Sequence, residues 1–160
     1  MSQAPFAIAG RMIGHGHSPY VIAEMSGNHN GSLERAKQLV QIARNAGANA
    51  VKLQTYTADT ITIRSNRPEF IVQEGLWKGR QLHELYEEAH TPWAWHPELF
   101  EFAKKVGITI FSSPFDPTAV DMLEKLGAPA YKIASAEIVD FGLMEYVASK
   151  GKPVIVSTGM

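Results

Sequence analysis

The sequence predicts an α/β fold built on a parallel β-sheet, and two observations support this prediction. Five short apolar runs, each ending in polar residues, begin at Val21, Val51, Ile108, Tyr131 and Val154. Runs that are apolar throughout are typical of strands buried on both faces, as in parallel sheets. Helical patterns separate the runs at a nearly regular period, which fits either a β/α barrel or a doubly wound sheet. In both folds, functional groups lie at the carboxyl ends of the strands.

Capping residues mark the helices between these strands. Ser32 can cap a helix over residues 33–46, and Gly47 follows it. Asp116, followed by proline, begins a helix that ends near Gly127, because aspartate is a good N-cap and proline suits the first helical turn. Asp140 and Gly151 bracket a further helix in the same way.

A long segment between Leu53 and Ile110 breaks the period and predicts an insertion after the second strand. It contains all three tryptophans. We expect a short helix over residues 82–89 and another that begins after Thr91 and Pro92 and ends near Gly107, with its exact start obscured by a later proline. Such long loops build substrate specificity or serve packing alone. The N-terminal stretch 6–14 predicts an extended lead-in that plugs the bottom of a barrel.

Composition restricts the class of function. The chain has 160 residues, 45% of them hydrophobic, and a net charge of −1, which disfavours nucleic acid as a partner. It has no cysteine, and no apolar run approaches the length needed to cross a membrane. These features predict a cytoplasmic protein that binds a small molecule.

Charged residues inside the apolar runs are the first candidates for a site. Lys52 and Lys132 lie within strands, where lysine needs a partner, and an anionic ligand would supply one. The alternative is an internal ion pair with Glu24 or Glu137. Glu24 ends the first strand and is a candidate acid or base, or else a carboxylate satisfied by backbone amides.

Hydroxyl groups recur at three successive strand ends and suggest a phosphate cradle beside the lysines. These residues are Ser112, Ser113, Ser135, Ser157 and Thr158. Each serine taken alone is as well explained as a cap or turn residue.

The histidines give weaker signals. His29, in the loop after Glu24, either contacts substrate or pins the loop, whereas His15 and His17 fit a glycine-rich turn better than a metal site. The remaining three, His83, His90 and His96, are interpreted as surface or packing residues.

Taken together, the segments IAEMSGNHNGS, VKLQTYTADT, FSSPFD, YKIASAEI and GKPVIVSTGM resemble the sialic acid synthase family, which condenses phosphoenolpyruvate with an amino sugar. AEMSGNHNGSLERA and LWKGRQLHELYEEAHTPWAWH are most similar to the pseudaminic acid synthases of that family, whose sugar is a 2,4-diacetamido-2,4,6-trideoxy-altrose.

The resemblance implies a parallel (β/α)8 TIM barrel, of which residues 1–160 supply about the first five β/α units. It also implies a homodimer and a divalent metal such as Mn²⁺, whose ligands lie on later strands that this chain does not contain. An antifreeze-like domain would follow the barrel, and the fragment alone would be inactive.

By motif, Glu24 matches the family's mouth carboxylate, and Lys52 and Lys132 match its phosphoenolpyruvate-binding lysines. The hydroxyls of Ser113, Ser135 and Ser157 match those around the phosphate, and Gln54 and Glu137 fall at other positions lining the site. The alternatives are an N-acetylneuraminate or legionaminate synthase, another phosphoenolpyruvate-dependent aldol condensation, a lyase that uses a lysine Schiff base, and a non-catalytic anion-binding fragment.

Overall fold

The computed structural model describes residues 6–159. Its centre is a five-stranded parallel sheet in which the strands follow one another in chain order. The strands are β3 (Ile22–Glu24), β4 (Ala50–Thr55), β5 (Thr109–Pro114), β6 (Tyr131–Ile133) and β7 (Val154–Val156). This sequential order is that of a barrel, since a doubly wound sheet reverses its strand order at a switch point.

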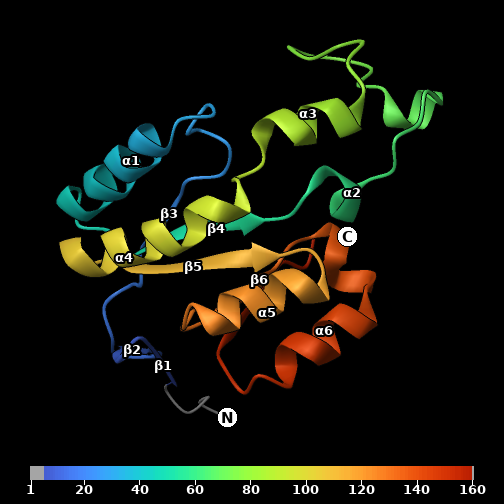
Figure 1. Cartoon of the computed structure of the whole chain (residues 1–160). Helices are drawn as coiled ribbons and strands as arrows, with labels where there is room; N and C mark the ends of the chain where they lie inside the picture. The colour runs from blue at the N-terminus through green and yellow to red at the C-terminus, as the bar shows by residue number, and fades with distance from the viewer. Residues whose placement is uncertain (1–5, 160) are drawn as a thin grey trace.

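Helices connect the strands and cover one face of the sheet (Figure 1). They are α1 (Leu33–Asn45), α4 (His96–Val106), α5 (Pro117–Lys125) and α6 (Phe141–Ala148). The predicted caps are confirmed: the side chains of Ser32, Asp116 and Asp140 accept hydrogen bonds from backbone N–H groups of the first helical turns. The last helix ends three residues before Gly151, earlier than the sequence pattern indicated.

Two clusters of buried apolar side chains hold the helices against this face of the sheet. The first joins α1 and α4 to the outward side chains of β4, including Val51 and Leu53, and the second joins α5 and α6 to Tyr131 and Ile133 of β6. Because side chains alternate along a strand, the residues between them point to the opposite, inner face.

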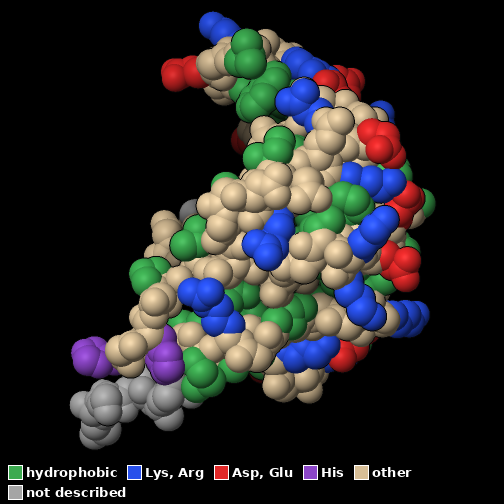
Figure 2. All heavy atoms as spheres, turned by 90° about the vertical axis from the view of Figure 1, so that its left-hand side faces the viewer, with side chains coloured by type: hydrophobic (Ala, Val, Ile, Leu, Met, Phe, Trp, Pro, Cys, Tyr) green, Lys and Arg blue, Asp and Glu red, His purple; other side chains and the backbone are tan. Residues whose placement is uncertain are grey.

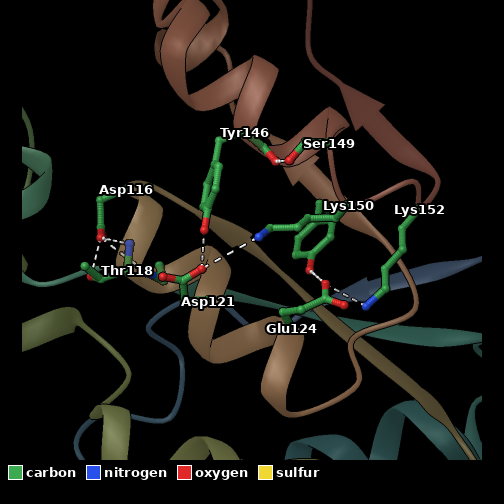
Figure 3. A network of polar contacts seen from close by, with 10 residues as sticks. Asp116, Thr118, Asp121, Glu124, Tyr146, Ser149, Lys150 and Lys152 are labelled. Carbon is green, nitrogen blue, oxygen red and sulfur yellow. Dashed lines mark hydrogen bonds and ion pairs between the residues drawn. The ribbon is translucent and has the colours of Figure 1, made fainter.

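A polar network reinforces the second cluster at its outer rim (Figure 3). The Tyr131 hydroxyl and the Lys152 ammonium both donate to the Glu124 carboxylate, and the Tyr146 hydroxyl donates to Asp121. These bonds tie the segment before β7 to α5 and α6. Their place on the helix-covered side makes the network structural.

The N-terminal lead-in is an antiparallel hairpin, a regular element that the sequence did not predict, formed by β1 (Phe6–Ile8) and β2 (Arg11–Ile13). Ile8 is 1% exposed and packs with Ala50, Phe111 and Ala130 on the inner side of the sheet. Ala50 and Ala130 lie at the amino ends of β4 and β6, so the hairpin closes the bottom of the sheet as expected.

The insertion between β4 and β5 folds into short elements above the carboxyl ends of the strands (Figure 1). They are α2 (Ala58–Ile61), the 3₁₀ turn η1 (Pro68–Phe70), α3 (Leu82–Ala89) and the 3₁₀ turn η2 (Trp93–Trp95). The predicted helix after Pro92 therefore starts as a 3₁₀ turn, and its α-helical part begins at His96 with Pro97 in the first turn.

The two edge strands are less buried than their apolar sequences indicated. Val156 of β7 is 46% exposed, because β7 pairs only with β6 among the described residues. On the face shown in Figure 2, basic and acidic side chains are interspersed, and the insertion overhangs the body above a hollow. In residues 6–159 no helix is long and apolar enough to span a bilayer.

Candidate functional site

Charged side chains gather at one level on the inner face of the sheet. Glu24 at the end of β3 stands directly beside Lys52 of β4 in the parallel register. Ser112 of β5 is paired with Tyr131 of β6, so the next residues along, Ser113 and Lys132, are also neighbours. The alternation of the strands therefore directs both predicted lysines to the inner face, above the apolar layer that contains Ile8.

Lys52 forms an ion pair with Glu24, which was the alternative that the sequence left open. The lysine side chain is 13% exposed and the glutamate 44%, so the pair lies at the boundary between interior and solvent. The Ser26 hydroxyl donates a second hydrogen bond to Glu24, at 3.0 Å. Glu24 is thus held at the mouth with one side open to solvent.

Lys132 has no carboxylate within 4 Å in the described part of the chain. Burial lowers its pKa, and repulsion by the Lys52 ammonium lowers it further, while Glu24 and Glu137 act in the opposite direction. An anion bound next to Lys132 would raise this pKa again, because it would stabilise the ammonium form.

The serines of β5 point to opposite faces. Ser113 lies on the inner face, is 1% exposed, and its hydroxyl has no hydrogen-bond partner among residues 6–159. Ser112 instead lies on the helix side, where its hydroxyl is 2.7 Å from Oγ1 of Thr55, which is 2.9 Å from Nε2 of His96. Buried hydroxyls are nearly always paired, so the Ser113 hydroxyl is available to a partner from outside residues 6–159.

The ends of β6 and β7 meet next to these groups. A Cβ at Gly159 would lie only 2.9 Å from the Ser135 hydroxyl, so the chain after β7 passes closely over that serine. Ser157 extends β7 by one backbone hydrogen bond to Ile133. Ser113 near the end of β5, Ser135 after β6 and Ser157 after β7 therefore lie at the carboxyl ends of three adjacent strands.

Glu137 lies on a 3₁₀ turn after β6, η3 (Ala136–Val139), that the sequence did not predict. Its Oε2 is buried without a partner among the described residues. Burial raises its pKa, and the nearby Lys132 partly opposes this effect. A carboxyl group with a raised pKa keeps its proton longer as pH rises, and can then donate a hydrogen bond.

His29 holds the loop after β3 in place. Its Nδ1 accepts a hydrogen bond from the Gly31 N–H, its Nε2 is 3.2 Å from the Thr91 hydroxyl, and its ring packs edge-on against Trp95. The ring is 1% exposed, and burial lowers its pKa. In this conformation both nitrogens are used by the protein.

The other histidines take structural positions. His83 and His96 are buried, and His83 Nε2 is 2.8 Å from Asp59, while His15 and His17 lie exposed in a turn. Among residues 6–159, no three His, Asp or Glu side chains come together as a metal site would require.

A pocket of about 600 Å³ opens next to the lysine cluster, and sequence reasoning did not identify most of its lining. Gln54, at the tip of β4 two residues beyond Lys52, forms part of its wall together with Tyr56. The insertion and the loop after β3 supply the other walls. The only sequence signal was the length of the insertion and its tryptophans.

Comparison with known proteins identifies the family to which the chain belongs. The model of the NeuB family matches residues 39–160. The chain is 48% identical over 141 residues to a pseudaminic acid synthase of Campylobacter jejuni, covering 88% of this chain and 41% of that protein. It is 49% identical to the pseudaminic acid synthase of Helicobacter pylori, covering 89% of this chain and 42% of that protein.

A solved structure is similar over the whole chain. It is the N-acetylneuraminic acid synthetase of Leptospira borgpetersenii in complex with citrate, with a TM-score of 0.83 and 30% identity. The match covers 100% of this chain and 51% of that protein. The chain thus spans about two fifths of the length of the curated relatives quoted above.

Proposed function

Because the chain belongs to the NeuB family, we propose that the protein to which it contributes condenses phosphoenolpyruvate with a 2,4-diacetamido-2,4,6-trideoxy hexose to give pseudaminic acid and phosphate. The single observation that supports this most strongly is a pair of groups on the inner face: the Lys132 ammonium, which forms no ion pair within residues 6–159, and the Ser113 hydroxyl, which has no hydrogen-bond partner there. Both are suited to an anion that carries a phosphate and a carboxylate.

In the proposed reaction, C3 of phosphoenolpyruvate attacks the aldehyde carbon of the open-chain sugar and forms the new C–C bond. The C=O π bond breaks, and its oxygen takes a proton, supplied overall by the water that adds at C2, to become a hydroxyl. Water adds at C2, and the resulting tetrahedral centre expels phosphate by C–O cleavage, leaving a 2-keto acid. Lys132, Lys52 and the serines hold the anion while its charge is redistributed.

Glu24 is proposed to handle a proton or orient the sugar at the mouth, with Gln54 and Glu137 lining the same space. Lys52 has a double role, because it fixes the Glu24 carboxylate and contributes positive charge to the anion site. A carboxylate fixed in this way is oriented before substrate arrives.

We also propose that the complete protein is a cytoplasmic homodimer that uses a divalent metal. The described residues do not provide a ligand set for the metal.

The test is to assay phosphate release by the full-length protein, with Mn²⁺ and phosphoenolpyruvate, against three sugars: the diacetamido-trideoxy altrose, the legionaminate precursor and N-acetylmannosamine. We expect turnover with the altrose derivative to exceed the other two. Release with none of the sugars would refute the proposal.

A second candidate is a lyase or aldolase that forms a Schiff base on Lys132, and the lowered pKa of that lysine favours it. Borohydride reduction in the presence of a keto acid separates the two functions. The synthase forms no covalent adduct, whereas a Schiff-base enzyme is trapped on Lys132 and inactivated.

A further inference from the structure

The pocket beside Gln54 is built by the insertion and has a distinct chemical character. Its walls are apolar and aromatic, with Ile61, Val72 and Trp77 from the insertion opposite Tyr56 at the tip of β4. Tyr56 is itself fixed edge-on against the rings of Tyr86 and Phe115, at 5.7 and 5.4 Å between centroids. A mostly apolar cavity with a few polar groups is typical of a small-molecule site.

The insertion is held firmly over the loop after β3. A Cβ at Gly27 would lie 3.0 Å from the carbonyl oxygen of Ala89, so α3 and that loop are in close contact. Val72 exchanges backbone hydrogen bonds with Gly79 and Arg80, which closes the segment that carries Trp77. Trp77 is nevertheless 55% exposed, so a large apolar side chain is held at the rim with half of its surface in water.

The pocket offers phosphoenolpyruvate no cationic partner in its lining. No lysine or arginine of the described residues lines it, and the carboxylate in its wall, Glu88, is already paired with Arg80 at 2.7 Å. The anion therefore belongs at the lysine cluster, and the pocket, which shares Gln54 with the inner face, is left for the neutral second substrate.

We infer that this pocket holds the methyl groups of the amino sugar, those of its acetamido substituents and of its deoxygenated C6, with Trp77 and Val72 as specificity-determining residues. The inference rests on the proposed function for the identity of the sugar. A hydroxyl added to the C6 methyl group would be buried against these apolar walls without a partner, which disfavours sugars that carry a C6 hydroxyl.

The experiment compares Trp77→Ala with Leu76→Ala in the full-length protein. Leu76 is the matched control, because it precedes Trp77, is 90% exposed and does not line the pocket. We expect Trp77→Ala to lower kcat/KM for the diacetamido-trideoxy sugar about tenfold. We expect a smaller loss for N-acetylmannosamine and an unchanged KM for phosphoenolpyruvate.

Two further measurements keep the inference testable if the first variant unfolds or the protein is inactive. Val72→Thr is nearly isosteric and should reduce the same preference through its hydroxyl. Saturation-transfer NMR with the diacetamido-trideoxy sugar should show its methyl protons as the most strongly saturated, and this signal should decrease in both variants, whether or not turnover occurs.

The outcomes separate the two claims. Saturation of the sugar's methyl protons without phosphate release would refute the proposed function but would still support the assignment of the pocket. Turnover with a sugar preference that neither Trp77→Ala nor Val72→Thr changes would overturn the inference. A dimer that dissociates in Trp77→Ala with unchanged sugar kinetics would also overturn it and identify the pocket as a subunit interface.

Discussion

Acidification should destabilise the mouth of the sheet through His96. This side chain is 0% exposed, its Nδ1 is 3.2 Å from the Pro92 carbonyl and its Nε2 is 2.9 Å from the Thr55 hydroxyl. A carbonyl can only accept, so Nδ1 carries the proton and Nε2 accepts from Thr55, which leaves Ser112 to donate to Thr55. The chain of bonds is satisfied only while His96 is neutral.

Burial is the main cause that lowers the pKa of His96 from 6.5 to about 4. The pKa of His96 is lower in the folded protein than in the unfolded chain. Between the two values, the unfolded chain therefore binds a proton at His96 and the folded protein does not. The contribution of neutral His96 to the free energy of unfolding is therefore fully present above pH 6.5 and is lost as pH falls toward 4. About 2.5 pH units at about 1.4 kcal/mol each give a loss of about 3.5 kcal/mol.

The assay is denaturant unfolding of the full-length protein, followed by tryptophan fluorescence between pH 7 and 4. His96→Gln should be less stable at pH 7 but should lose less stability on acidification than the wild type. The control His17→Gln, at an exposed turn, should retain the wild-type acid dependence. Equal acid sensitivity in His96→Gln, or an NMR titration midpoint of His96 near 6.5, would refute the reasoning.

Three further predictions concern single side chains. Ser113→Ala should weaken phosphoenolpyruvate binding with little effect on stability, because the Ser113 hydroxyl has no protein partner in residues 6–159. Ser112→Ala should instead lower the free energy of unfolding by about 1 kcal/mol, because it removes the hydrogen bond to Thr55. Tyr131→Phe should also cost about 1 kcal/mol, by loss of its bond to Glu124, and calorimetry should find unchanged ligand affinity. Glu24→Gln should lower kcat far more than phosphoenolpyruvate affinity, since Lys52 is released toward the anion; equal losses would make Glu24 structural.

The fold was largely predictable because short stretches of sequence determine most of its strands and helices. Apolar runs and capping residues such as Ser32 and Asp116 determine where strands and helices begin, and alternation within β4 places Lys52 on the face opposite Leu53. The choice between barrel and doubly wound sheet was not local, because it depends on strand order, which no repeat length specifies.

The sequence indicated which residues form the candidate site. It did not indicate which groups those residues contact. Whether Lys52 met an anion or Glu24 depended on the register between β3 and β4, which long-range packing sets. The separate roles of Ser112 and Ser113 follow from alternation only after one face is known to carry helices. The pocket could not be predicted, because it depends on the tertiary fold of the insertion and no short sequence motif indicates that fold.

The most direct test of the central claim is calorimetric titration of phosphoenolpyruvate into full-length protein carrying Lys132→Met. Lys104→Met, on an exposed turn of α4, is the matched control. If Lys132 holds the anion, its replacement weakens binding at least about tenfold, which is about 1.4 kcal/mol, while the control binds like the wild type. Equal affinity in the two variants would contradict the claim that the inner face of this sheet is an anion site.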